Sequence, residues 1–247
     1  MAVSIAASYG HAESFDTPLH KTVLDLGRSQ YLMSNDNRHV TVTCSYYRHF
    51  MVKEKNDPGM KGAELIALTP TQPGSRPKCL EALQANEKEF TQWSDEYKKF
   101  MTWNGYFAGV KRDLIFLKWP DGDDNSGLPF AEFQSDAKTI LFKDSVTLLA
   151  GGRTYINFLP ASGGQIVLRY LRVTNANCSI PKSRQICWKK PQKQTGLHHS
   201  PMPKCSDYKG NEAGKVPSVI AYPVEVSLYP KPSTHAVGGP VRCYPQE

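Results

Sequence analysis

The six cysteines constrain this chain of 247 residues more than any other feature of its sequence. No two of them have the C-x-x-C spacing with which zinc ribbons and redox motifs bring two thiolates together. An even number of widely spaced cysteines therefore predicts structural disulfides, and disulfides persist in oxidising compartments. We expect a periplasmic or extracellular protein whose disulfide candidates are Cys44, Cys79, Cys178, Cys187, Cys205 and Cys243.

Six cysteines allow fifteen pairings, and the sequence alone cannot choose among them. The pairing that we favour closes a short loop between Cys178 and Cys187. It also joins Cys44 to Cys79 and Cys205 to Cys243, and the alternative is that some cysteines are free and buried.

The rest of the chain favours short strands, since its 18 glycines and 18 prolines imply many turns. Residues 40–47 alternate between apolar and polar side chains, as a half-buried strand does, and we expect 63–68 to be their antiparallel partner. Pro223 marks its segment as an edge strand or as a strand that starts after the proline. Further strand candidates are 22–26, 113–119, 128–134, 139–144, 153–159, 165–174 and 217–229.

These segments predict a mainly β (α+β) fold, with antiparallel sheets in a sandwich or partial-propeller arrangement. The strand–turn–strand rhythm of residues 113–145 resembles one blade of a β-propeller, although no second copy follows at a fixed period. We expect residues 13–247 to form a single β-rich domain.

One stretch departs from the strand pattern. Between Cys79 and Met101, large apolar residues recur at steps of three and four, which predicts an amphipathic helix near 79–101 that covers a sheet. The residues that carry this pattern are Leu80, Leu83, Phe90, Trp93, Tyr97 and Phe100.

The first twelve residues allow two interpretations. Gly10 and Ala12 are small residues at the −3 and −1 positions of a signal-peptidase site, but no basic stretch comes before them. Residues 1–12 are either a signal-peptide remnant or an uninformative terminus. No apolar run approaches the ~20 residues of a membrane-spanning helix, so we expect no transmembrane segment.

Residues 175–215 lack periodicity, and we expect a loop-rich segment pinned by disulfides. Between Lys182 and Lys215 there are eight Lys and Arg residues and only two acidic ones. Such an excess attracts anionic partners, so we predict binding to an acidic protein or polysaccharide; the alternative is a solvated loop. Nucleic acid is not expected, because aromatic side chains for base stacking are sparse. The candidate binding residues are Lys182, Arg184, Lys189, Lys190 and Lys193.

An acidic loop is the one candidate metal site. Asp121, Asp123, Asn125 and Glu132 match positions 1, 3, 5 and 12 of the EF-hand calcium loop. Ser126 stands where that loop has glycine, and the flanks are strand-like. A calcium loop between strands and an ordinary polar hairpin loop both remain open, and no other cofactor is expected.

The sequence lacks the usual signatures of hydrolases, including G-x-S-x-G, H-E-x-x-H and phosphate-binding glycine loops. Our leading hypothesis is therefore an exported, non-catalytic binding protein. The alternative is a secreted hydrolase of polysaccharides or esters with a calcium-stabilised loop at 121–132, and with carboxylates such as Glu64, Asp113 and Glu132 as candidates.

Overall fold

The computed structural model confirms a mainly β fold of antiparallel sheets with three disulfides. It describes residues 15–94, 97–103, 105–118, 128–133, 140–147, 156–160, 165–208, 215–228 and 231–246. Within these ranges there is a single α-helix, and no helix has the length and apolar character that crossing a membrane requires.

All six cysteines are paired, and the favoured pairing is confirmed. The Cα atoms lie 5.8 Å apart in Cys44–Cys79, 5.9 Å apart in Cys178–Cys187 and 4.4 Å apart in Cys205–Cys243. Three structural disulfides indicate an oxidising environment.

The chain divides into two compact units, and the boundary falls within strand β11 (Ile140–Thr147). The first unit is Phe15–Ser145, and the second contains Val146–Glu247. The single domain expected over 13–247 stays a prediction.

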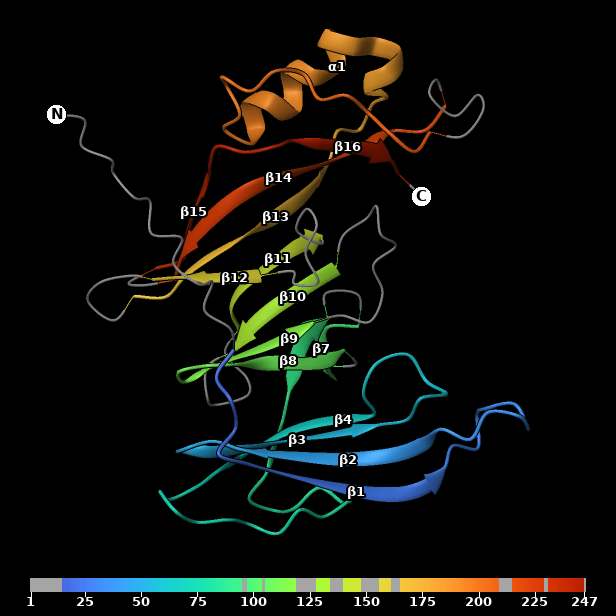
Figure 1. Cartoon of the computed structure of the whole chain (residues 1–247), viewed down its shortest axis with the longest axis vertical. Helices are drawn as coiled ribbons and strands as arrows, with labels where there is room; N and C mark the ends of the chain where they lie inside the picture. The colour runs from blue at the N-terminus through green and yellow to red at the C-terminus, as the bar shows by residue number, and fades with distance from the viewer. Residues whose placement is uncertain are drawn as a thin grey trace, which may run out of the picture. The chain divides into compact units, whose positions relative to one another are not determined.

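The first unit contains a five-stranded antiparallel sheet in the order of the chain (Figure 1). Its strands are β1 (His20–Arg28), β2 (His39–Tyr46), β3 (Phe50–Asn56), β4 (Leu65–Pro70) and β5 (Lys88–Glu89). The expected pairing of 40–47 with 63–68 is wrong, because β3 lies between these two strands. Its sequence, FMVKEKN, has three charged residues that obscure its strand character.

A second sheet packs against the first. It contains β8 (Tyr106–Lys111), β9 (Leu114–Lys118) and β10 (Leu128–Phe133). Apolar side chains of both sheets form one buried cluster, which is the arrangement of a β-sandwich. The cluster includes Phe50, Val52, Ile66 and Leu68 from the first sheet, and Val110, Ile115 and Leu117 from the second.

A bulge in β8 brings the N-terminal end of this unit onto the second sheet. The register with β9 shifts between Phe107 and Gly109, and the Phe107 amide donates to Glu54 Oε1 at 2.8 Å. Burial is the main reason that the pKa of Glu54 is raised, and the hydrogen bond from Phe107 opposes that rise.

Gly109 lies where the N-terminal end of the unit meets β8. A Cβ at this position would lie 2.5 Å from the Phe15 ring, so only glycine permits the ring to lie so close to the strand.

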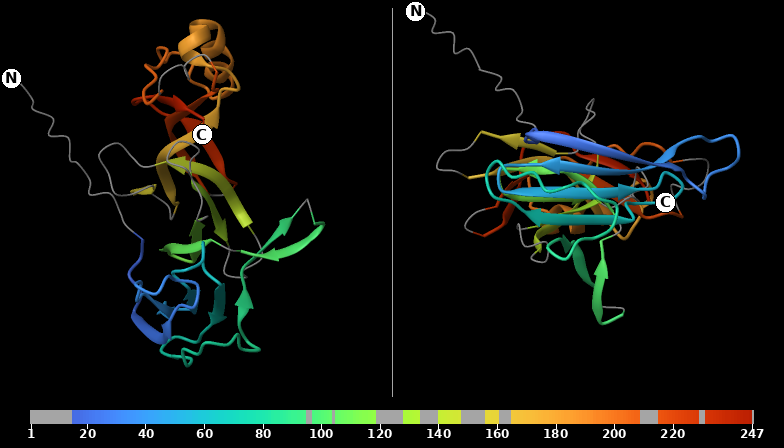
Figure 2. Two further views of the ribbon diagram at one scale, coloured as in Figure 1. Left: turned by 90° about the vertical axis from the view of Figure 1, so that its right-hand side faces the viewer. Right: turned by 90° about the horizontal axis from the view of Figure 1, so that it is seen from below.

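The amphipathic helix expected near 79–101 is wrong. Described residues there form β5 and the hairpin of β6 (Thr91–Ser94) and β7 (Lys99–Thr102) (Figure 2). In this hairpin Trp93 pairs with Phe100. Residues 80 and 82 are not helical, and their carbonyls accept hydrogen bonds from Lys53 Nζ at 3.2 and 2.8 Å. In a helix those carbonyls would bind the amides four residues later.

A buried ion pair holds the 71–87 segment against the five-stranded sheet. The Lys53 and Glu87 side chains pair directly and are 0% and 2% exposed. Glu87 also accepts from the Gln84 amide at 2.9 Å, and Tyr46 donates to the Pro77 carbonyl at 2.8 Å. The Cys44–Cys79 disulfide joins the same segment to β2.

The second unit is built around β14 (Ser218–Ser227), which pairs with β13 (Val167–Asn175) along its length. On its other side β14 pairs with β15 (Ser233–Ala236) and β16 (Arg242–Pro245), while β12 (Ile156–Leu159) pairs with β13. The expectation of an edge strand at Pro223 is therefore wrong. The proline is tolerated because β16 pairs with residues 218–221 and β15 with 224–227, which leaves Pro223 between them.

Candidate functional site

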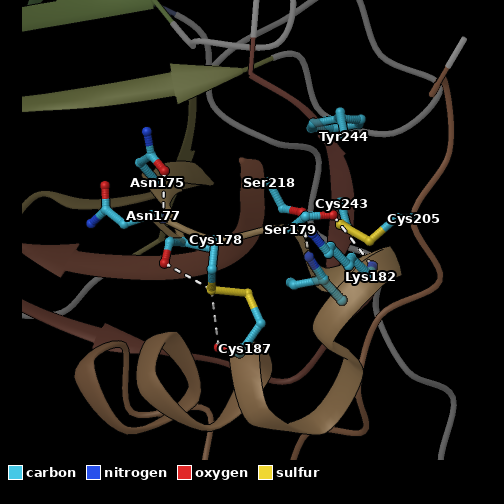
Figure 3. The surroundings of a disulfide bond; sticks show 12 residues. Asn175, Asn177, Cys178, Ser179, Lys182, Cys187, Cys205, Ser218, Cys243 and Tyr244 are labelled. Atoms are coloured by element: carbon cyan, nitrogen blue, oxygen red, sulfur yellow. Dashed lines mark hydrogen bonds between the residues drawn. A yellow bond between two sulfur atoms is a disulfide. The ribbon is translucent and has the colours of Figure 1, made fainter. Parts of the chain in front are cut away.

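The basic segment folds as a helix, α1 (Ile180–Gln194), where we expected irregular loops over 175–215. Ser179 is its N-cap and accepts from the Lys182 amide at 3.3 Å, and a proline in the first turn suits the fixed backbone there. The Ile180 amide donates to Ser218 Oγ at 2.8 Å, so the helix start is fixed to β14 (Figure 3).

The middle of α1 is fixed by a disulfide and by packing. Cys187 is bonded to Cys178, which comes just before the helix (Figure 3). Trp188 is fully buried, and Pro191 is buried beside it on the same face. The backbone of Arg184 is not helical (φ 44°, ψ −123°), so the chain kinks between the first turn and residues 185–194.

The C-terminal end of α1 is closed by a glycine. Gly196 has φ 75°, and the amides of Thr195 and Leu197 donate to the carbonyls of Pro191 and Gln192 at 2.9 and 3.0 Å. The Gln192 side-chain amide also donates to the Ser200 carbonyl at 3.0 Å. The helix is thus held at its start, middle and end.

All five predicted binding residues lie on α1, and all five side chains are exposed. We call this set the basic face: Lys182, Arg184, Lys189, Lys190 and Lys193. None of the five forms an ion pair with an acidic residue in the described parts of the chain. The structure therefore places the predicted residues on one kinked helix, with Lys182 before the kink at Arg184 and the other three lysines after it.

The unit that carries the basic face has many more basic residues than acidic ones. The second unit, with residues 1–14, has thirteen Lys and Arg against five Asp and Glu, whereas the first unit has seventeen against eighteen. Glu225, one of the few described acids of the second unit, pairs with Arg169. The net charge of +7 therefore originates in the unit that carries α1.

The cations of the basic face make opposing contributions to the stability of the helix, since the helix dipole favours Lys193 in the last turn. Lys189 and Lys193 are four residues apart, where like charges cost about 0.2–0.5 kcal/mol. Lys182 lies in the first turn, where the helix dipole disfavours a cation by about 0.3–1 kcal/mol. Helix stability alone therefore does not account for the cations of the basic face.

The first unit has two adjoining shallow pockets, of about 290 and 310 Å³, which share His49, Phe50 and Asp113. The larger pocket is also lined by Asp16 and Tyr47. Burial, and secondarily the charge of Asp16, raise the pKa of Tyr47 to about 12, so this hydroxyl stays protonated at neutral pH. Asp16 accepts from the Arg112 amide and lies 3.3 Å from Lys111 Nζ.

The predicted calcium loop is not tested by the structure. Asp121, Asp123 and Asn125 lie outside the described residues, and Glu132 is within strand β10. Of the other carboxylates, Glu64 pairs with Lys55 at 3.0 Å. No group of three or more His, Cys, Asp or Glu that could hold a metal occurs in the described ranges.

Sequence reasoning missed one exposed apolar residue of α1, Ile186, which is 84% exposed. Its position became significant only once 180–194 was known to be helical.

Comparison of the chain with protein-family models, curated proteins and solved structures gave no match. The case for function therefore rests on the residues of this chain.

Proposed function

We propose that this is an exported, non-catalytic binding protein that uses the basic face of α1 to hold an acidic partner, a protein or a polysaccharide. The observation that carries the proposal is five exposed cations on a helix fixed at three places, with no acidic residue paired to them in the described chain. A rigid element presents such charges without the entropy cost of ordering a loop.

The three disulfides support the export part of the proposal, because they persist where thiols are not kept reduced. Two of them, Cys178–Cys187 and Cys205–Cys243, belong to the unit that carries α1. Both the periplasm and the extracellular space provide such conditions.

Binding through exposed charges is recognised by its dependence on salt concentration. An exposed ion pair contributes about 0.2–1 kcal/mol, so several together supply an attraction of a few kcal/mol. The Debye length is about 10 Å at 0.1 M salt and about 3 Å at 1 M, so this attraction weakens as salt is added.

Neutralising Lys189, Lys190 and Lys193 as a triple Lys→Gln variant is expected to weaken binding to immobilised heparin and to poly-L-glutamate by about tenfold or more at low salt. Three lost pairs of about 0.5–1 kcal/mol each correspond to such a factor. Surface plasmon resonance at several salt concentrations measures the change and its salt dependence.

The matched control is the triple variant Lys21→Gln, Lys78→Gln, Lys88→Gln. These lysines are exposed and lie in the first unit, and their loss changes the net charge by the same amount. Equal weakening by the two triple variants would show a general charge effect, and unchanged affinity in the α1 variant would refute the proposal.

The second candidate is a secreted hydrolase of polysaccharides or esters, with a calcium-stabilised loop at 121–132. The observation in its favour is the pair of pockets that His49 and Asp113 both line, since hydrolases combine such groups as acid and base. It predicts turnover of a polysaccharide or ester panel that is lost in Asp113→Asn and depends on calcium. No turnover by the wild-type protein, with or without calcium, would remove this candidate.

A further inference from the structure

Ile186 is the most exposed large apolar side chain in the described part of the chain, at 84%. Isolated exposed apolar residues are common on protein surfaces. This one is distinguished by its position on α1, where the residues three, four and seven positions later are all lysines.

Helical periodicity after the kink places Ile186 on the same side of α1 as three lysines. Residues three, four and seven positions later share its side of a helix, and these are Lys189, Lys190 and Lys193. The buried residues of the same segment, Cys187, Trp188 and Pro191, lie on the opposite side. Ile186 therefore points outward from α1 with lysines beside it.

This arrangement discriminates between kinds of anionic partner. A polyanionic sugar chain offers no apolar pocket, so it gains nothing from an isoleucine. A membrane surface takes up a continuous apolar face of a helix. In α1 the other apolar residues, such as Ile180 and Trp188, are buried within the protein.

A protein surface fits both features. Protein interfaces concentrate binding energy in a few residues that fill desolvated pockets, with polar or charged contacts around them. We propose that the partner of the basic face is a protein with an apolar pocket for Ile186 and acidic residues at the rim of that pocket. This inference rests on the proposed function, because it takes α1 as the binding surface.

The contribution of Ile186 can be separated from that of the lysines. Full burial of such a side chain corresponds to a ten- to hundredfold change in affinity, on the order of 1.5–3 kcal/mol. Because Ile186 is exposed in the free protein, Ile186→Ser should leave the melting temperature unchanged.

The test selects peptides from a displayed random library on the wild-type protein and measures their affinity for four proteins. These are the wild type, Ile186→Ser, Ile186→Leu and the triple Lys→Gln variant of Lys189, Lys190 and Lys193. Met33→Ser is the matched control, since Met33 is 80% exposed in the first unit. Heparin and phosphatidylcholine–phosphatidylglycerol vesicles are measured with the same proteins.

We expect selected peptides that combine acidic and large apolar residues. Their affinity should fall at least tenfold in Ile186→Ser and in the lysine variant, and change little in Ile186→Leu and Met33→Ser. Heparin binding should depend on the lysines alone.

Two results would overturn the inference and leave the proposed function intact. One is that purely acidic peptides dominate and bind Ile186→Ser as well as the wild type. The other is that Ile186→Ser weakens binding to vesicles as much as to peptides, which favours a membrane. If the lysine variant keeps its affinity for peptides and heparin, the proposed function itself fails.

Discussion

Replacing Lys53 with methionine is expected to lower the free energy of unfolding by about 3–5 kcal/mol, since it leaves one partner of a buried ion pair uncompensated. The Glu87 side chain is 2% exposed and would lose its cation. The carbonyls of Leu80 and Ala82 would also lose the ammonium group that now donates to them. Urea denaturation of the variant and the wild type measures the difference.

Two further variants identify the cause of that loss. The double variant Lys53→Met, Glu87→Leu should recover much of the stability, because an apolar pair of similar volume often replaces a buried ion pair without loss. Lys55→Met should cost no more than about 1 kcal/mol, since Lys55 is 17% exposed and pairs with the exposed residues Glu64 and Glu81. An equally small effect of Lys53→Met would contradict the argument from burial.

Removing the Cys44–Cys79 disulfide, as Cys44→Ala, Cys79→Ala, is expected to cost about 2–4 kcal/mol. The bridge closes a sequence separation of 35 residues and so restricts the unfolded chain strongly. When the disulfide variant is combined with Lys53→Met, the loss of unfolding free energy should be smaller than the sum of the losses from the two separate changes. Both interactions hold the 71–87 segment against the same sheet, so their effects are coupled. Urea denaturation of the combined variants gives the coupling energy.

The control is Cys178→Ala, Cys187→Ala, in which the sequence separation is only 9 residues. The chain-entropy model gives this shorter loop about 1 kcal/mol less stabilisation. This variant should also show additive behaviour with Lys53→Met, since the two sites belong to different units. A larger loss from the shorter loop would show that effects in the native state outweigh loop closure.

Most strands could be located from the sequence, because period-two alternation is a local property. Residues 22–26, 128–134 and 165–174 correspond to β1, β10 and β13 within a few residues. The pairing of strands was harder to predict. β3 was missed because Lys53 is buried at a position where the pattern suggests a solvated side chain.

The helix was placed in the wrong part of the chain because spacing of three and four residues has more than one structural origin. Leu80 and Leu83 are 41% and 46% exposed in the 71–87 segment, and Phe90 is buried in the sandwich core. Trp93 and Phe100 are cross-strand partners. The conformation of the 71–87 segment depends on contacts with Lys53 and Cys44, which are distant in the sequence. A local sequence pattern does not contain such contacts.

The signals of the true helix were present but weak. Ser179 and Gly196 mark its two ends, while the central proline and the run of cations obscure the buried residues Ile180, Cys187, Trp188 and Pro191. The charge excess could therefore be found from the sequence. The shared side of Lys189, Lys190 and Lys193, with Ile186 beside them, could be identified only once the helix was known.

The disulfide across the start of α1 has a consequence for proteolytic damage. Lys182 and Arg184 both lie between Cys178 and Cys187, and both are exposed. A trypsin-like protease that cuts after either residue would leave the two pieces covalently joined, so the nicked chain would gain the mass of one water and lose no fragment. Such an enzyme could open the backbone at the kink without releasing α1, and the cut would be visible on a gel only after reduction.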